Sequence, residues 1–462
     1  MELDMTKGSP AKLILKFIIP IIIGNVFQQL YNMVDTIVVG RFVGVKALAA
    51  VGSTGTIMFL IFGFVMGITT GFTVITSQRF GAGDYEAMKK SIGNAVLLSV
   101  AVTVVMTFIS VFFMDGLLRV MNTPEDIFDM AKEYLFIICV GMGGCVLYNL
   151  MASILRAVGN SKVPLYFLIF SSIVNIVLDL VLILQFDMGV AGAAYATVIS
   201  QGLSGILCIV YIYKSVPLLH VRKTDFVPDW YCIWNQIRIG VPMALQFSIT
   251  AIGAILVQAA LNLLGSIVVA AFTAACKVCE LVTQPFNAMG MTMATYGAQN
   301  RGINDFDRMK KGVRVANIMS AIYSVVIYLI TIPIIPYMVS LFVSGDTSQI
   351  IGYVRTYLLL CGLFYIPLGM IFIYRNILQG AGFSFAPMMG GVVELVCRAV
   401  IAYVAAKNHS YLGVCISDVA AWAITGIYLW ISYVVIMRRL CAKGAVRKEV
   451  LTETTRVHSQ DE

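Results

Sequence analysis

Besides Glu133, at the very start of one segment, five acidic residues lie within apolar stretches long enough to cross a bilayer: Asp35, Asp179, Glu280, Glu394 and Asp418. A charged side chain at the middle of a bilayer costs at least about 2.5–3.5 kcal/mol, so it persists where it faces a cavity, has a partner or performs a task. Removal from water disfavours the charged form of a carboxyl group, which suits it to reversible protonation. The chemistry that these residues indicate is binding and release of protons or cations.

Asp35 and Asp179 are the strongest candidates. Asp35 lies in the segment QQLYNMVDTIVVGR and has no charged residue closer in sequence than Arg41. The alternative is that the Asp35 carboxyl group stays hydrated at the outer membrane interface near Arg41. Asp179 follows Asn175 by four residues, so both lie on one helix face and together could hold a proton or a cation. The alternative there is a polar clamp between helices.

Two further polar residues, Asn149 and Thr197, are candidates for the same pocket.

The remaining acids have basic neighbours on their own helices. Lys277 precedes Glu280 by three residues, and Glu394 precedes Arg398 by four, so each pair is predicted to form an ion pair inside the membrane. Both pairs remain open to a structural role or to a role in a cavity that binds substrate. Asp418 lies near the start of the last apolar segment and is interpreted as interfacial.

The composition requires a membrane around these residues. The chain has 462 residues, of which 59% are hydrophobic and only 12% charged, and its mean hydropathy is +0.89. A soluble domain carries about twice that share of charge, so a soluble enzyme, a nucleic-acid-binding protein and a disordered regulator are excluded. Twelve segments are predicted to be transmembrane helices: 13–39, 47–77, 92–114, 131–155, 163–185, 188–213, 236–262, 267–296, 313–336, 353–379, 386–406 and 411–437.

The basic residues predict the orientation. With the N-terminus inside, 23 of the 32 Lys and Arg residues lie on the cytoplasmic side. Both termini are therefore predicted to be cytoplasmic, in a multi-pass protein of the cell (inner) membrane. The net charge of +8 is then a topology signal and gives no reason to expect a nucleic-acid partner. No metal site or cofactor is expected, since the lone Cys276-x-x-Cys279 has no second pair.

The chain also repeats itself, in three matched blocks that follow the same order in each half. The loop QRFGAGDYEAMKK from Gln78 matches QNRGINDFDRMKK from Gln299. Gly44-VKALAAV matches Gly265-SIVVAAF, and Leu155-RAVGNSKVP matches Leu378-QGAGFSFAP. The prediction is an all-α membrane protein of two six-helix lobes, related by a pseudo-twofold axis along the membrane normal. The N-terminal lobe spans 1–213, a cytoplasmic linker 214–235, the C-terminal lobe 236–440 and a cytoplasmic tail 441–462.

Nearly the whole chain resembles the multidrug and toxic compound extrusion (MATE) family. The resemblance rests on the LYNMVDTIVVGRFVGVKALAAVG stretch, the SQRFGAG and YGAQNRG loops and the LRAVG and LQGAG turns. It is closer to the DinF-like branch, whose N-lobe cluster the residues Asp35, Asn175, Asp179 and Thr197 match, with Asn149 as a further member. The NorM-like branch places carboxylates in spans 7 and 10, which this chain lacks there.

The resemblance implies a monomeric antiporter that exports small organic compounds, often cationic, in exchange for protons or sodium ions. The C-lobe residues Lys277, Glu280, Glu394 and Arg398 remain candidates for lining its cavity. One alternative is a flippase for lipid-linked oligosaccharides, or another metabolite exporter of the same superfamily. A membrane enzyme is the alternative from another class. It lacks support, because no residues suited to catalysis recur together in the spans.

Overall fold

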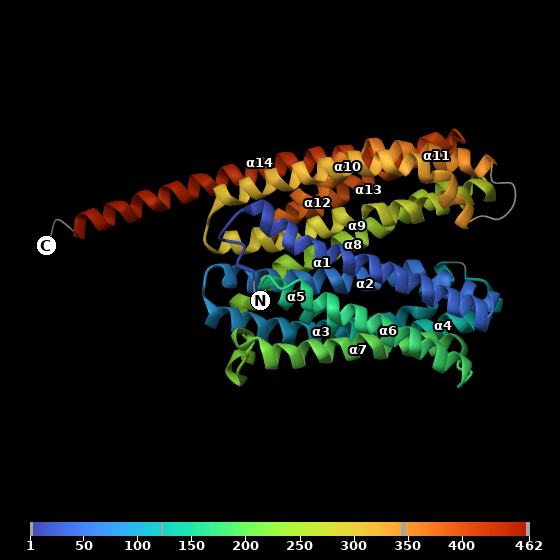
Figure 1. The fold of residues 1–462 in the computed structure, drawn as a ribbon, viewed down its shortest axis with the longest axis horizontal. Coiled ribbons are helices and arrows are strands. Elements are labelled where there is room, and N and C mark those ends of the chain that lie inside the picture. Colours follow the sequence, from blue (N-terminus) through green and yellow to red (C-terminus); the bar gives the residue numbers. More distant parts are fainter. Residues whose placement is uncertain (1–2, 122, 343–347, 459–462) are drawn as a thin grey trace.

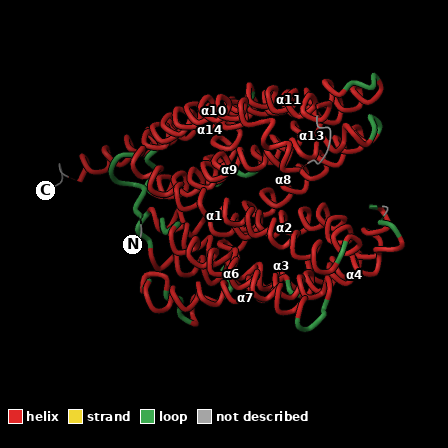
Figure 2. Tube along the Cα trace, turned by 45° about the vertical axis from the view of Figure 1, so that its right-hand side comes forward, coloured by secondary structure: helices red, strands yellow, loops and turns green. Residues whose placement is uncertain are grey.

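The structure is a computed structural model that describes residues 3–121, 123–342 and 348–458, and all elements within them are helical (Figures 1 and 2). The first lobe contains α1 (Pro10–Val38) with a π-helical turn η1 (Val39–Val43), α2 (Val45–Gly81), α3 (Tyr85–Val120), α4 (Glu125–Val140), α5 (Met142–Ala157), α6 (Lys162–Leu184) and α7 (Gly189–Ser215). Two short 3-10 helices, η2 (Pro217–Leu219) and η3 (Lys223–Phe226), lie in the linker. The second lobe contains α8 (Trp230–Asn262), α9 (Ser266–Gly302), α10 (Phe306–Phe342), α11 (Ser348–Leu363), α12 (Tyr365–Gly380), α13 (Phe385–Lys407) and α14 (Tyr411–His458).

Ten of the described helices are long and apolar enough to cross a membrane singly. The pairs α4–α5 and α11–α12 bend by 47° and 53° at their junctions, and each counts as one broken span, which gives the predicted twelve. The predicted spans 131–155 and 353–379 are therefore each bent at a break between two helices. At the first break, a Cβ on Gly141 would collide with Val198 of α7, so this position packs too closely for a larger residue.

Several helices extend beyond the predicted apolar segments, because the repeated polar loops are themselves largely helical. The helix α3 begins at Tyr85, and the Asp84 side chain caps it by accepting a hydrogen bond from the Ala87 amide at 3.1 Å. At the matching position of the second repeat, Asp305 accepts a bond from the Arg308 amide at 2.9 Å. The sequence repeat is thus also a repeat of local structure.

The two lobes lie side by side with their helices roughly parallel (Figure 1). Both chain termini lie toward one end of the molecule, which we call the termini end, and the opposite end is the distal end. Corresponding helices have equal lengths: α6 and α13 have 23 residues each, and α4, α5, α11 and α12 have 16 each. This agreement supports the predicted duplication and defines equivalent positions in the two lobes.

The helix α1 contributes to both lobes. Its first half packs into the core of the second lobe through Ile14, Phe17, Ile18 and Ile21. Beyond Pro20 it packs on the first lobe, where Gly24 faces side chains of α6. This helix therefore connects the Asp35 site of the first lobe with the core of the second.

The lobes touch most closely where α2 crosses α8. A Cβ on Gly67 would lie 2.7 Å from the Ala244 Cα atom, and a Cβ on Gly71 would overlap Gly240. A Cβ on Gly63 would lie 3.2 Å from the Phe247 side chain. The three glycines of this GxxxGxxxG pattern therefore allow the backbones of α2 and α8 to pack closely. Glycine is required at this interface for space.

We expect Gly71→Ala to lower the thermal stability of the purified protein, because overpacking a close contact costs about 1–3 kcal/mol. Gly55→Ala is the matched control, since a Cβ at Gly55 of the same helix meets no atom within 4 Å. The control should be neutral or slightly stabilising through helix propensity. Equal melting temperatures for both variants would contradict the close crossing.

Candidate functional site

The first lobe holds a group of five residues that we call the N-lobe polar cluster: Tyr31, Asp35, Asn175, Asp179 and Thr197. Tyr31 and Asp35 lie one turn apart late in α1, Asn175 and Asp179 one turn apart in α6, and Thr197 early in α7. The Thr197 hydroxyl lies 3.4 Å from the Tyr31 hydroxyl and accepts a hydrogen bond from the Asn175 amide at 3.4 Å. Asn175 and Asp179 are fully buried, so the cluster forms a polar centre inside the lobe.

The carboxyl groups of Asp35 and Asp179 lie next to each other in this cluster. Neither is in an ion pair with any described Lys, Arg or His, Arg41 included. Both Asp179 oxygens, Asp35 Oδ1 and Asn175 Oδ1 are buried without a described hydrogen-bond donor. Two adjacent buried carboxyl groups cannot both stay ionised without a positive partner. The geometry therefore suits a shared proton or a cation held by oxygen ligands.

Two tyrosines belong to this environment that sequence reasoning missed. Tyr31 bonds Thr197 directly, and Tyr134 of α4 is buried beside Asp35 and Asp179. Tyr31 precedes Asp35 by four residues, so its place on the same helix face was a usable signal. Tyr134 carries no such local signal, because it reaches the site only through the packing of α4.

Asn149 is not brought into a described contact with either carboxyl group. Its amide nitrogen donates to the backbone oxygen and the sulfur of Cys145, one turn earlier in α5, at 2.9 and 3.2 Å. Cys145 itself lies close to Tyr31. Asn149 thus flanks the N-lobe polar cluster.

The second lobe holds a different centre, which we call the C-lobe charged network: Tyr357, Arg375, Glu394, Arg398 and Asp418. Glu394 accepts from Arg375 at 3.3 Å and from Arg398 at 3.1 Å, and Arg398 pairs with Asp418 at 3.1 Å. The Tyr357 hydroxyl donates to the other Asp418 oxygen at 3.0 Å. Two basic and two acidic side chains, nearly excluded from solvent, form a chain with no net charge.

The network explains Glu394 and Arg398 as an ion pair, and it adds residues that the sequence alone did not connect. Asp418, interpreted as interfacial, is buried within the lobe and is paired with Arg398. The repeat was the missed signal. With the matched blocks aligned, Arg398 stands at the position of Asn175 and Tyr357 at that of Tyr134. The two centres therefore occupy equivalent places, one with unpaired carboxyl groups and the other with paired charges.

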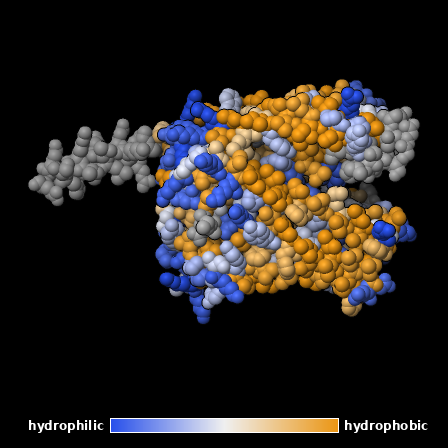
Figure 3. All heavy atoms as spheres, viewed as in Figure 1, coloured by the Kyte–Doolittle hydropathy of each residue, from blue (hydrophilic) through white to orange (hydrophobic). Residues whose placement is uncertain are grey.

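Lys277 and Glu280 form the predicted pair at 3.1 Å, but their side chains are 57% and 51% exposed, so the pair is separate from the buried network. Both lie on one stripe of α9 with Thr273 and Asn287, whose side chains are also exposed. Figure 3 shows the surface indented between the lobes toward the distal end.

The termini end is closed by contacts that repeat across the lobes. Gln78 of the first lobe donates to the Gly380 carbonyl of the second at 2.8 Å. Gln299 of the second lobe donates to the Ala157 carbonyl of the first at 3.0 Å. Gln78 and Gln299 are equivalent in the repeat, and so are Ala157 and Gly380, so the two bonds form a reciprocal pair.

The N-terminal segment reinforces this closure. The Met5 amide donates to the Gln299 side chain at 2.8 Å, and the Met5 carbonyl accepts from Asn300 and Arg308. The backbone of Leu3 lies against Gly159 of the first lobe. The segment thus contacts both lobes where they meet.

A recess lies between the lobes next to this closed end. The first lobe contributes Thr70, Thr73, Ser77, Ser153 and Arg156, and the second contributes Met291, Thr295 and Asn376. The Arg156 guanidinium donates to the Ser153 hydroxyl at 2.9 Å and pairs with no described carboxylate. The recess is therefore polar and carries an uncompensated positive charge.

A duplicated twelve-span bundle, with a polar centre in each lobe and a recess between them, defines a membrane transporter. The MatE family model matches residues 20–181 and again residues 242–404, once in each lobe. The chain is also 30% identical to the probable multidrug resistance protein YpnP of Bacillus subtilis (strain 168), over 87% of this chain and 88% of the relative. The chain belongs to the MatE family. Its members are transporters, so the alternative of a membrane enzyme is excluded.

More distant relatives carry different names. The probable multidrug resistance protein NorM of Thermotoga maritima is 25% identical over 86% of both chains. A FAD transporter of Shewanella oneidensis is 24% identical over 93% of this chain and 95% of the relative. A solved structure of an outward-facing multidrug resistance MATE transporter has a TM-score of 0.88 at 23% identity, covering 95% of this chain and 98% of that chain. The last similarity confirms the fold.

The buried pairs of Glu394 and the exposed pair of Glu280 should respond differently to mutation. Glu394→Gln leaves Arg375 and Arg398 buried with one acid between them, and loss of one partner of a buried pair costs about 3–5 kcal/mol. Glu280→Gln breaks an exposed pair and should cost less than about 1 kcal/mol. Thermal unfolding of the purified variants checks this, and a Glu394→Gln protein as stable as Glu280→Gln would contradict a structural network.

Proposed function

We propose that this protein is a secondary active efflux transporter that exchanges protons or sodium ions for organic drugs or toxic compounds, mostly cationic, by alternating access. The observation that carries the proposal is the pair of buried carboxyl groups, Asp35 and Asp179, with no positive partner among the described residues. Such a pair binds a proton or a cation strongly. The coupling ion supplies the positive charge that the pair lacks. Relatives named as multidrug resistance proteins support the class of substrate.

In this proposal the termini end is cytoplasmic and the distal end faces outward, in the cell's inner membrane. Residues 1–213 and 236–440 move as two lobes of a monomer, joined by the linker 214–235, with 441–462 as a cytoplasmic tail. The state described here is closed at the cytoplasmic end by the reciprocal bonds of Gln78 and Gln299. Opening inward requires both bonds to break.

The ion and the substrate drive this exchange through binding that differs between the two states. From outside, a proton or cation reaches Asp35 and Asp179, with Asn175, Thr197 and the flanking Asn149 as proposed supporting groups. The substrate then leaves outward. On the cytoplasmic side the ion is released, and the carboxylates and the cavity again favour a cationic substrate. Lys277 and Glu280 are proposed to line the cleft, whereas Glu394 and Arg398 hold the second lobe together.

We expect Asp35→Asn and Asp179→Asn each to abolish ion-driven export of a fluorescent cationic dye, because an amide neither binds a proton nor supplies a charge to a cation. The measurement uses proteoliposomes with an imposed proton gradient or an imposed sodium gradient. The gradient that drives wild-type export identifies the coupling ion.

Asp129→Asn is the matched control, since Asp129 is an exposed acid of α4 with no described ion pair, and it should keep wild-type flux. Dye export by the wild type that responds to neither gradient would refute antiport. Full coupling in both Asp35→Asn and Asp179→Asn would refute the assignment of the site.

A second substrate class is favoured by one observation. The unpaired Arg156 guanidinium in the interlobe recess suits a compound that bears a carboxylate or a phosphate. A relative named as a FAD transporter agrees with such a substrate. Export of an anionic metabolite, or flipping of a lipid-linked oligosaccharide, is therefore the alternative function.

We expect Arg156→Gln to weaken transport of anionic compounds by about tenfold or more, because loss of a charged hydrogen bond removes about 1.5–3 kcal/mol. Counterflow of one anionic and one cationic dye in proteoliposomes measures the change. If Arg156→Gln leaves the ratio of the two fluxes unchanged, the alternative function loses its support.

A further inference from the structure

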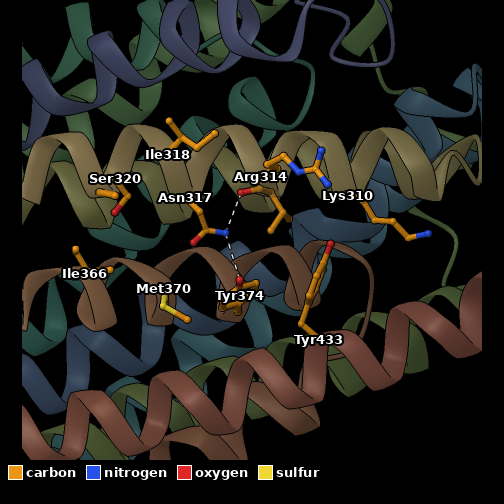
Figure 4. A pocket seen from close by; sticks show the side chains of 11 residues that line it. Lys310, Arg314, Asn317, Ile318, Ser320, Ile366, Met370, Tyr374 and Tyr433 are labelled. Atoms are coloured by element: carbon orange, nitrogen blue, oxygen red, sulfur yellow. Dashed lines mark hydrogen bonds between the residues drawn. The ribbon is translucent and has the colours of Figure 1, made fainter.

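A groove of about 600 Å³ opens on the second lobe between α10, α12 and α14, away from the interlobe recess (Figure 4). Its described lining residues are Lys310, Val313, Arg314, Asn317, Ile318, Ser320, Ala321, Ile366, Met370, Tyr374 and Tyr433. Ile318 and Ile366 are 54% and 43% exposed. Since these residues belong to membrane-spanning helices, their exposed faces meet the lipid.

The lining of the groove changes from charged to apolar along its length. Lys310 and Arg314 lie on the first turns of α10, toward the termini end. Asn317 donates to the Tyr374 hydroxyl at 3.3 Å across the middle, and Ile318, Ile366 and Met370 lie beyond (Figure 4). From Lys310 to Ala321 the helix rises about 16 Å. A charged mouth followed by an apolar channel of this length suits an amphiphile with an anionic head.

At the equivalent place in the first lobe, the linker packs against the helices. Leu219 of the linker is 2% exposed and packs in one core cluster with Ile92 of α3, Met151 of α5 and Cys208 of α7. Gly93 of α3 allows this, since a Cβ there would collide with the Asp225 carbonyl of the linker.

The second lobe breaks the symmetry at that position. Arg314 is the repeat equivalent of Gly93, so the place that admits the linker in one lobe carries a cationic side chain in the other. As far as residue 458, the described chain after this lobe does not return over the groove as the linker does, because α14 continues as a helix away from the bundle (Figure 1). A duplicated cavity is thus filled by protein in one lobe and left open in the other.

Two polar groups at the groove have no partner among the described residues. Arg314 forms no ion pair, although the neighbouring Lys310 pairs with Asp307 at 3.2 Å. The Tyr433 hydroxyl is buried and unbonded, in a side chain that is 8% exposed. A buried hydroxyl without a partner is rare and indicates a bound group that completes it.

We propose that this groove binds one anionic phospholipid from the leaflet on the termini side. The phosphate pairs with Arg314 and accepts a hydrogen bond from the Tyr433 hydroxyl, and one acyl chain lies along Ile318, Ala321 and Met370. Charge complementarity selects the occupant, because basic grooves between transmembrane helices bind anionic head groups. The bound lipid takes the structural place that the linker occupies in the first lobe. This proposal is independent of the transported substrate.

The test measures retention of phosphatidylglycerol against phosphatidylcholine by the purified full-length protein, using native mass spectrometry. The wild type should retain one phosphatidylglycerol in preference to phosphatidylcholine. Arg314→Gln should weaken that binding about fivefold, the value of one basic residue near an anionic lipid. Lys214→Gln is the matched control, because Lys214 is an exposed basic residue at the same end of the first lobe, and it should bind as the wild type does.

A second variant separates the groove from general surface charge. Ala321→Trp fills the apolar part while leaving every charge in place, so it should also lose the bound lipid. Circular dichroism and the melting temperature verify that the variants are folded. The proposal is overturned if Arg314→Gln and Lys214→Gln weaken binding equally, or if phosphatidylcholine binds as well as phosphatidylglycerol. Displacement of the lipid by the transported dye would also overturn it, since the groove would then be a substrate path.

Discussion

Two carboxyl groups that face each other inside a lobe, with no described basic residue to neutralise them, are the constraint on which the rest of this structure depends. Asp35 and Asp179 gain little from their neighbours, because Asn175 and Thr197 bond mainly to each other and to Tyr31. In the proposed mechanism, a proton or cation that enters and leaves supplies the positive charge that the site lacks.

The second lobe shows how duplication separated two tasks. At the positions of Asn175 and Tyr134 it carries Arg398 and Tyr357, which form a charge-balanced network with Asp418, Arg375 and Glu394. A net charge of zero removes the need for an external ion. The tyrosine is retained, but its partner is now an aspartate already paired with arginine. Equivalent backbone positions therefore support carboxyl groups without ion pairs in one lobe and ion-paired side chains in the other.

The fold could be predicted from the sequence because hydrophobic length and the repeat are both local patterns. The breaks at Gly141 and Phe364 could not, since each bent pair reads as one apolar run. Within the site, Asp35, Asn175, Asp179 and Thr197 are each visible as polar residues in apolar segments. The burial of Asp418 escapes a local reading, because it depends on Arg398 of the preceding helix and on Tyr357 of a third helix.

The same symmetry indicates how the N-lobe polar cluster is linked to the closed termini end. Gln78 and Gln299 form reciprocal bonds, so separating the lobes at the termini end breaks both together. The helix α1 belongs to both lobes, with Ile14 and Phe17 in the second core and Asp35 in the first. Pro20 lies between these parts and removes one backbone hydrogen bond, which makes bending easiest there. In the proposed mechanism, movement of one lobe against the other therefore acts on α1, the helix that carries Asp35, and a change of charge at Asp35 acts on the helix that contacts both lobes.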